Sequence, residues 1–147
     1  MTNKEKAPVP EIFWVTPRLG IADAQNGIYA ANTGHLTVAN VAGEVDNPKA
    51  NVQLPLLPFA CEKSKLDFLT NWINHWIHNE PGRLVVHCFH GLDRSPLVIA
   101  WYLYRFRDMT LDEAYEKIRL VRPTVNDRRD WVVTIAPYTI EEKSSGD

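Results

Sequence analysis

Hydrophobic residues recur along the chain with two different periods, and their order predicts the fold class. Short apolar runs typical of β-strands occupy residues 12–15, 18–22, 36–41, 52–56 and 84–87. Apolar residues that recur every three or four positions predict helices over residues 64–77, 97–104 and 111–121. Because strands alternate with helices before a run of helices closes the chain, we expect an α/β fold with a central mixed sheet flanked by helices.

Some helix ends can be predicted from local side-chain chemistry. Ser64 and Asp67 have the spacing of a capping box at the start of one helix, and Thr110 and Glu113 have it at the start of another. Helical spacing late in the chain predicts one more helix, marked by Trp131, Ile135 and Tyr138.

Length and composition indicate one folded domain. A chain of 147 residues, 45% of them hydrophobic, can bury one substantial core but is short for two. We expect residues 11–140 to form this domain, between flexible tails at residues 1–10 and 141–147. Both tails are rich in charged and small residues and lack a hydrophobic period.

Charge and hydropathy restrict the kinds of partner that we expect the chain to bind. A net charge of −2 provides no overall basic field for nucleic acid or an anionic membrane. No stretch resembles a secretory signal or reaches the ~18 apolar residues of a membrane span. Two cysteines in a chain with this core do not require a disulfide. We therefore expect a cytoplasmic protein, monomeric and without a membrane partner.

The most informative segment is a predicted strand, loop and helix start over residues 84–97. A loop that opens a helix points backbone N–H groups at the positive end of the helix dipole, which suits a phosphate-sized anion. Cys88 begins this loop and Arg94 ends it. The electropositive hollow favours the thiolate form of Cys88, which beside a bound phosphate is a nucleophile.

The other residues of the loop fit this chemistry. The planar guanidinium of Arg94 can bind two phosphate oxygens at once, which a lysine cannot do. Gly91 permits positive φ, and Ser95 places a hydroxyl near the sulfur at the helix start. Pro96 suits the first helical turn, where its missing N–H costs nothing.

The run His87-Cys88-x5-Arg94-Ser95 resembles the signature of the cysteine-dependent protein tyrosine phosphatases, and Gly91 with Arg94-Ser95-Pro96 resembles the dual-specificity branch. The resemblance implies an α/β phosphatase fold and a phosphocysteine intermediate on Cys88, with no metal or cofactor. It also implies that His87 tunes the nucleophile and that Asn126 braces the loop. The catalytic residues would be Cys88, Arg94 and Ser95, and the phosphate would be bound by Phe89, His90, Gly91, Leu92, Asp93 and Arg94.

One expected residue of this family is missing. Members carry an Asp general acid after a strand similar to Ile-Pro-Val-x-Asp, and the matching stretch here, residues 54–58, ends in Pro58. General acid catalysis contributes ~10²–10⁴-fold, so its loss matters most for basic leaving groups. Among Glu62, Asp67 and Asp93, we favour Glu62 as a substitute because it lies nearest to the expected loop.

Three functional interpretations follow from these residues. The first is a phosphatase acting on phosphotyrosine and also on phosphoserine or phosphothreonine of proteins. The second is an RNA 5′-triphosphatase or other polyphosphate phosphatase, since residues 87–94 also resemble the His-Cys-Thr-His-Gly-Leu-Asn-Arg loop of that branch, which lacks the Asp. The third is a pseudophosphatase that binds phosphorylated ligands without turnover, against which the presence of Cys88 and Arg94 argues. Only the second would bring nucleic acid as a partner.

Overall fold

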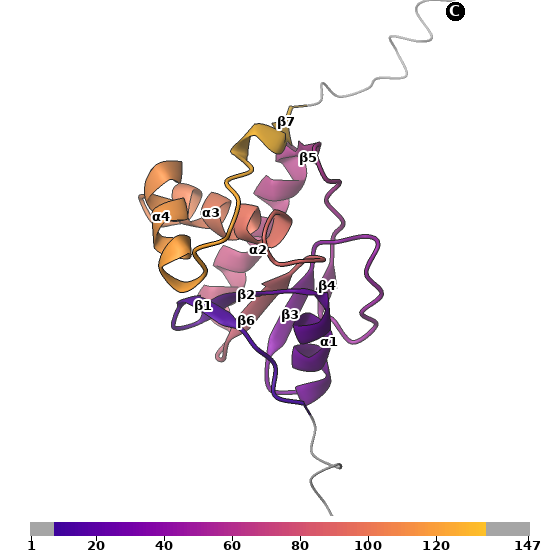
Figure 1. Cartoon of the computed structure of the whole chain (residues 1–147). Coiled ribbons are helices and arrows are strands. Elements are labelled where there is room, and N and C mark those ends of the chain that lie inside the picture. The colour runs from indigo at the N-terminus through magenta and orange to yellow at the C-terminus, as the bar shows by residue number, and fades with distance from the viewer. Residues whose placement is uncertain (1–7, 135–147) are drawn as a thin grey trace, which may run out of the picture.

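The computed structural model describes residues 8–134, and a five-stranded sheet forms its centre (Figure 1). The strand order is β1-β2-β6-β3-β4, in which β1 runs antiparallel to β2 and the other neighbours pair in parallel. The strands are β1 (Phe13–Thr16), β2 (Leu19–Ala22), β3 (Thr37–Asn40), β4 (Val52–Gln53) and β6 (Leu84–His87). The expected central mixed sheet is thereby confirmed.

Helices cover both faces of this sheet. The helices are α1 (Ala24–Thr33), α2 (Lys63–Asn79), α3 (Arg94–Phe106) and α4 (Leu111–Val121). Helix α1 lies on one face, and α3 lies on the other with α2 and α4 beside it (Figure 1). The central strand β6 serves both layers, since Val85 packs into the core under α1 while Leu84 and Val86 pack into the larger core under α3. Strands that are buried on both faces read as continuous apolar runs, as β6 does.

The helix starts show where local signals hold and where they fail. Thr110 and Glu113 form the predicted capping box, with both reciprocal hydrogen bonds present. The capping box predicted from Ser64 and Asp67 is wrong, because α2 begins at Lys63 after Glu62 and has no side-chain cap. Tertiary contacts decide this helix start: β5 (Cys61–Glu62) is paired to β7 (Val132–Val133), and the Asp67 carboxylate accepts a hydrogen bond from Trp101 Nε1 at 2.8 Å.

The last predicted helix is also wrong within the described residues. Trp131 ends a single 3₁₀ turn, Arg129–Trp131, and the chain continues as β7 (Val132–Val133), which pairs in parallel with β5. The two β-branched valines suit this pairing. The helical spacing of Trp131, Ile135 and Tyr138 predicted a helix in its place. Ile135 and Tyr138 lie outside the described residues, as do residues 1–7 of the first predicted tail and all of the second. Among residues 8–134, no helix is both long and apolar enough to cross a membrane.

Candidate active site

Cys88 follows the last residue of β6, and its sulfur is enclosed by the loop that leads into α3. The backbone N–H of Gly91 donates to Cys88 Sγ at 3.3 Å, and Ser95 Oγ lies 3.4 Å from the same sulfur. Cys88 is 2% exposed. The loop therefore wraps around the sulfur and offers hydrogen bonds to it, as a nucleophilic thiolate requires.

Gly91 is needed for the shape of this loop. Its φ is 71°, in the left-handed region, and a Cβ on it would lie 2.8 Å from the carbonyl carbon and oxygen of Ala22. Backbone hydrogen bonds hold the loop on both sides of this glycine, from Ala24 N to Phe89 O at 2.9 Å and from Asn126 N to Leu92 O at 3.0 Å. A side chain at Gly91 would thus push the loop away from the sheet.

The outer end of the loop is tied down through Asp93. Its carboxylate accepts hydrogen bonds from Asn126 Nδ2 at 2.8 Å and from Arg128 Nε at 2.9 Å. These contacts fix Asp93 directly before Arg94, the first residue of α3. The bracing role predicted for Asn126 agrees with this contact, and it stays a prediction until it is tested.

His87 is fully buried and joins two segments that are distant in sequence. Asn47 Nδ2 lies 2.9 Å from His87 Nε2, and His87 Nδ1 lies 3.1 Å from the carbonyl oxygen of Cys88. Since an amide nitrogen only donates, Nε2 accepts and Nδ1 carries the proton given to Cys88 O. Burial lowers the pKa of His87, so the ring is neutral at neutral pH. A neutral imidazole that is hydrogen-bonded at both ring nitrogens fixes the orientation of the Cys88 peptide group.

Gly27 of α1 makes room for this histidine, because a Cβ there would lie 2.3 Å from two His87 ring carbons. Alanine inside a helix normally stabilises it by ~0.5–1 kcal/mol over glycine. We expect Gly27→Ala to do the opposite, lowering the free energy of unfolding by about 1–3 kcal/mol and lowering activity as well. Thermal unfolding and steady-state kinetics measure both effects.

The control is Gly34→Ala, at a position with φ of 75° but no atom within 4 Å of the added Cβ. It should lower stability through backbone strain and leave kinetics unchanged. A Gly27→Ala protein with wild-type stability and activity would contradict the packing of α1 against His87.

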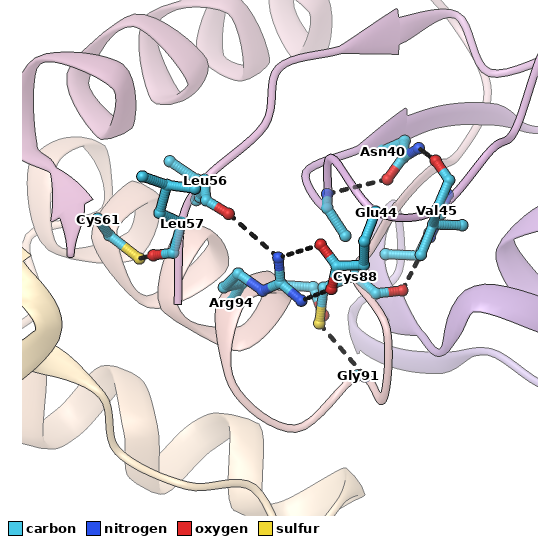
Figure 2. Close-up of polar contacts among 12 residues, drawn as sticks. Asn40, Glu44, Val45, Leu56, Leu57, Cys61, Cys88, Gly91 and Arg94 are labelled. Carbon is cyan, nitrogen blue, oxygen red and sulfur yellow. Dashed lines mark hydrogen bonds and ion pairs between the residues drawn. The ribbon is translucent and has the colours of Figure 1, made fainter. Parts of the chain in front are cut away.

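Arg94 is oriented by a carboxylate that the sequence patterns did not indicate. Arg94 Nη1 donates to Glu44 Oε1 at 2.9 Å and to Leu56 O at 3.1 Å, and Nη2 donates to Glu44 Oε2 (Figure 2). The side chain of Arg94 is 6% exposed and that of Glu44 is 44% exposed. Figure 2 shows the sulfur of Cys88 beside the guanidinium, on the loop that leads to α3.

These contacts leave one edge of the guanidinium for a ligand. A guanidinium has five N–H donors, of which Glu44 and Leu56 take three. The remaining two, on Nε and Nη2, share one edge, and the described residues provide no acceptor for either. A tetrahedral oxyanion can accept both hydrogen bonds at once.

We expect Glu44→Gln to lower kcat/KM about tenfold, because a neutral amide loses the bidentate ion pair that orients Arg94. The hydrogen bonds from Arg94 lower the pKa of Glu44 from 4.5 to about 2. Since the folded pKa is depressed, the pair contributes fully above pH 4.5 and is lost as pH falls towards 2. The loss in Glu44→Gln should therefore be constant across the pH range of an activity assay.

Asp46→Asn is the matched control, since Asp46 is an exposed acidic residue of the same loop. It should keep wild-type kinetics. Equal effects of the two substitutions would contradict a specific role for Glu44.

The guanidinium opens into a hollow of about 380 Å³ whose walls are partly aromatic. Its lining residues are Glu44, Pro58, Phe59, Phe89, His90, Asp93, Arg94 and Trp131. Phe59 is 76% exposed, and its ring centroid lies 4.8 Å from that of Trp131. The hollow therefore combines a buried cation with a partly aromatic rim.

Pro58 lies at the edge of this hollow, where an Asp was expected. The segment makes a tight turn, closed by a hydrogen bond from Ala60 N to Leu57 O at 3.3 Å. Glu62 does not line the hollow; its carboxylate lies 4.0 Å from Lys65 Nζ. Asp67 is bonded to Lys63 and Trp101, while Asp93 lines the hollow but accepts from Asn126 and Arg128. An acid role for Glu62 stays a prediction that this geometry does not favour.

Comparisons with known proteins identify the family of this chain. The mouse protein "Dual specificity protein phosphatase 18" is 27% identical over 128 residues, which cover 83% of this chain and 67% of that protein. The human "Dual specificity protein phosphatase 16" is 33% identical over 57 residues, 39% of this chain. The match spans only 9% of the length of that human protein.

A solved structure of human DUSP28 has the same fold, with a TM-score of 0.68 and 22% sequence identity over 86% of this chain and 91% of that chain. The family model described as "Dual specificity phosphatase, catalytic domain" matches residues 29–140, which contain both Cys88 and Arg94. The chain belongs to the family of dual-specificity phosphatase catalytic domains.

Proposed function

We propose that the chain hydrolyses aryl phosphomonoesters, phosphotyrosine of proteins foremost, through a phosphocysteine on Cys88 and without an Asp general acid. The observation that carries the proposal is the pairing of Cys88 Sγ, held by Gly91 N–H and Ser95 Oγ, with the open Nε–Nη2 edge of Arg94. A nucleophile at the start of the loop and a bidentate oxyanion binder at its end are the two groups that the chemistry needs.

The reaction needs two in-line displacements at phosphorus. The Cys88 thiolate forms an S–P bond as the bond to the leaving oxygen breaks, and that oxygen departs with the electron pair. Water then attacks phosphorus, the S–P bond breaks, and inorganic phosphate leaves with the thiolate restored. Ser95 Oγ, 3.4 Å from the sulfur, donates a hydrogen bond to the departing thiolate in the second step.

The surroundings of the site favour an aryl leaving group. Without an acid, the leaving oxygen carries its full negative charge, which a phenol with a pKa of ~10 tolerates better than an alkyl alcohol. The rim formed by Phe59, Phe89 and Trp131 also offers aromatic faces against which a substrate ring can pack. Phosphotyrosine should therefore be a better substrate than phosphoserine.

A series of aryl phosphates with phenols of graded pKa tests this proposal. We expect log kcat/KM to fall steeply as the phenol pKa rises, and the basic limb of the pH profile that reports a general acid to be absent. A shallow dependence with a bell-shaped profile would overturn the absence of an acid. Glu62→Gln and Asp93→Asn would then identify the group that replaces it.

A panel of three phosphorylated substrates tests which substrate class the chain prefers. Under the proposal, phosphotyrosine peptide should be cleaved more efficiently than either phosphothreonine peptide or triphosphate-ended RNA. Preferred cleavage of triphosphate-ended RNA would assign the chain to polyphosphate chemistry instead. Binding of all three without turnover would indicate a pseudophosphatase.

A further inference from the structure

A second hollow, of about 410 Å³, lies at the end of the sheet opposite to the sulfur. Arg18 lines it and directly precedes β2, whose first residue, Leu19, pairs with Leu84 at the start of β6. Cys88 follows the other end of β6. Four strand residues, roughly 13 Å at ~3.3 Å each, therefore separate this hollow from the phosphate-binding loop.

The lining of this hollow is apolar below and basic at the rim. Ile77, Leu103 and Met109 provide the apolar part, and Arg18, Arg107 and Lys117 provide three cationic groups. No acidic residue lines the hollow, and none of the three cations forms an ion pair with a carboxylate among residues 8–134. In a chain of net charge −2, this is a local cluster of positive charge.

Two of the cations are held in place by neutral groups. Arg18 donates from Nε to Gly82 O at 2.7 Å and from Nη1 to Ile77 O at 2.9 Å, and it lies over the Trp76 ring. Arg107 donates from Nε to the Tyr102 hydroxyl at 3.1 Å. Carbonyls and hydroxyls orient a guanidinium without cancelling its charge. Binding of a ligand here would therefore cost little side-chain entropy of these two arginines.

We propose that this hollow is a docking site for an acidic segment of a partner protein, with one hydrophobic side chain seated on the apolar floor. Charge complementarity with the three cations selects the acidic residues, and the floor selects the apolar anchor. The volume lies in the range of built ligand sites. The hollow is separate from the phosphate loop, so docking leaves Cys88 and Arg94 open to substrate.

A fluorescein-labelled peptide of repeated Glu-Glu-Leu units tests the site by fluorescence polarisation. Saturating inorganic phosphate is present to occupy the active site. We expect saturable binding that weakens with added salt. Lys117→Glu should weaken it about five- to tenfold, whereas Lys49→Glu, an exposed lysine outside the hollow, should not. Replacing Leu by Ser in the peptide should also weaken binding. Hydrolysis of a small aryl phosphate should be unchanged in both variants.

Several results would overturn the proposal. They are absence of saturable binding, equal effects of Lys117→Glu and Lys49→Glu, and much tighter binding of the peptide when phosphate is left out. Binding to anionic phospholipid vesicles but not to the peptide would assign the patch to a membrane surface instead. None of these results bears on catalysis at Cys88, which the aryl phosphate assay measures separately.

Discussion

Cys88→Ser is expected to lower kcat for an aryl phosphate by about 10⁴-fold or more, because a serine hydroxyl in this loop is a far weaker nucleophile than a thiolate. The loop N–H groups and Arg94 are retained, so the variant should still bind substrate. Steady-state kinetics and calorimetric binding of a phosphotyrosine peptide measure the two effects.

The second cysteine of the chain provides the control. Cys61 is fully buried, its Sγ lies 3.3 Å from Leu57 O, and burial raises the pKa of its thiol to about 11. A thiol of this kind is inert at neutral pH, so Cys61→Ala should retain turnover. Turnover by the Cys88→Ser protein, or its loss in a folded Cys61→Ala protein, would contradict the assignment of the nucleophile.

Arg94→Lys should lower kcat/KM by about 10³-fold, since lysine keeps the charge and loses the two parallel N–H donors on the Nε–Nη2 edge. The loss should appear largely in kcat if these hydrogen bonds tighten as the transferring phosphoryl group spreads. Arg105→Lys is the matched control, because Arg105 lies on the same helix and its polar contacts within residues 8–134 are all to groups of α2. Comparable losses in the two variants would contradict the role of Arg94.

The Glu44 contact gives a further check on this account. Because Glu44 acts through Arg94, adding Glu44→Gln to Arg94→Lys should cost little beyond the Arg94 substitution alone. Additive losses would mean that Glu44 has a separate function in the hollow.

The sequence predicts the secondary structure around this site where the residues are close together in the chain. The strand, the loop and the helix start all lie within residues 84–97, so the period of apolar residues and the local chemistry of Gly91, Ser95 and Pro96 specify them. The capping box at Thr110 is predictable for the same reason, since its two side chains lie three residues apart.

Residues that reach the site from far away in the chain were not predictable. Glu44 lies 50 residues before Arg94, and Asn47 lies 40 residues before His87. No period or spacing connects such pairs; only the parallel pairing of β3 with β6 brings the loop after β3 over the phosphate loop. A charged residue in a turn, such as Glu44, has no sequence signal that separates it from an ordinary solvated one.

The short β5–β7 pair was not predicted from the sequence, for a related reason. Each strand has two residues, too few to show a period of two, and the pairing joins Cys61 to Val132 across 71 positions. This contact overrides both the predicted capping box at Ser64 and the helical spacing that begins at Trp131. It also places Trp131 against Phe59 at the rim of the hollow.

Trapping of the covalent intermediate shows whether Cys88 carries the phosphoryl group. The Ser95→Ala protein should release phosphate from the sulfur more slowly than it forms the S–P bond, so a rapidly quenched reaction should show a burst of phenol equal to the enzyme concentration. Mass spectrometry of the quenched protein should then find one phosphoryl group on the peptide that contains Cys88. A burst without phosphate on Cys88, or a phosphoryl group on His90 instead, would contradict catalysis through a phosphocysteine.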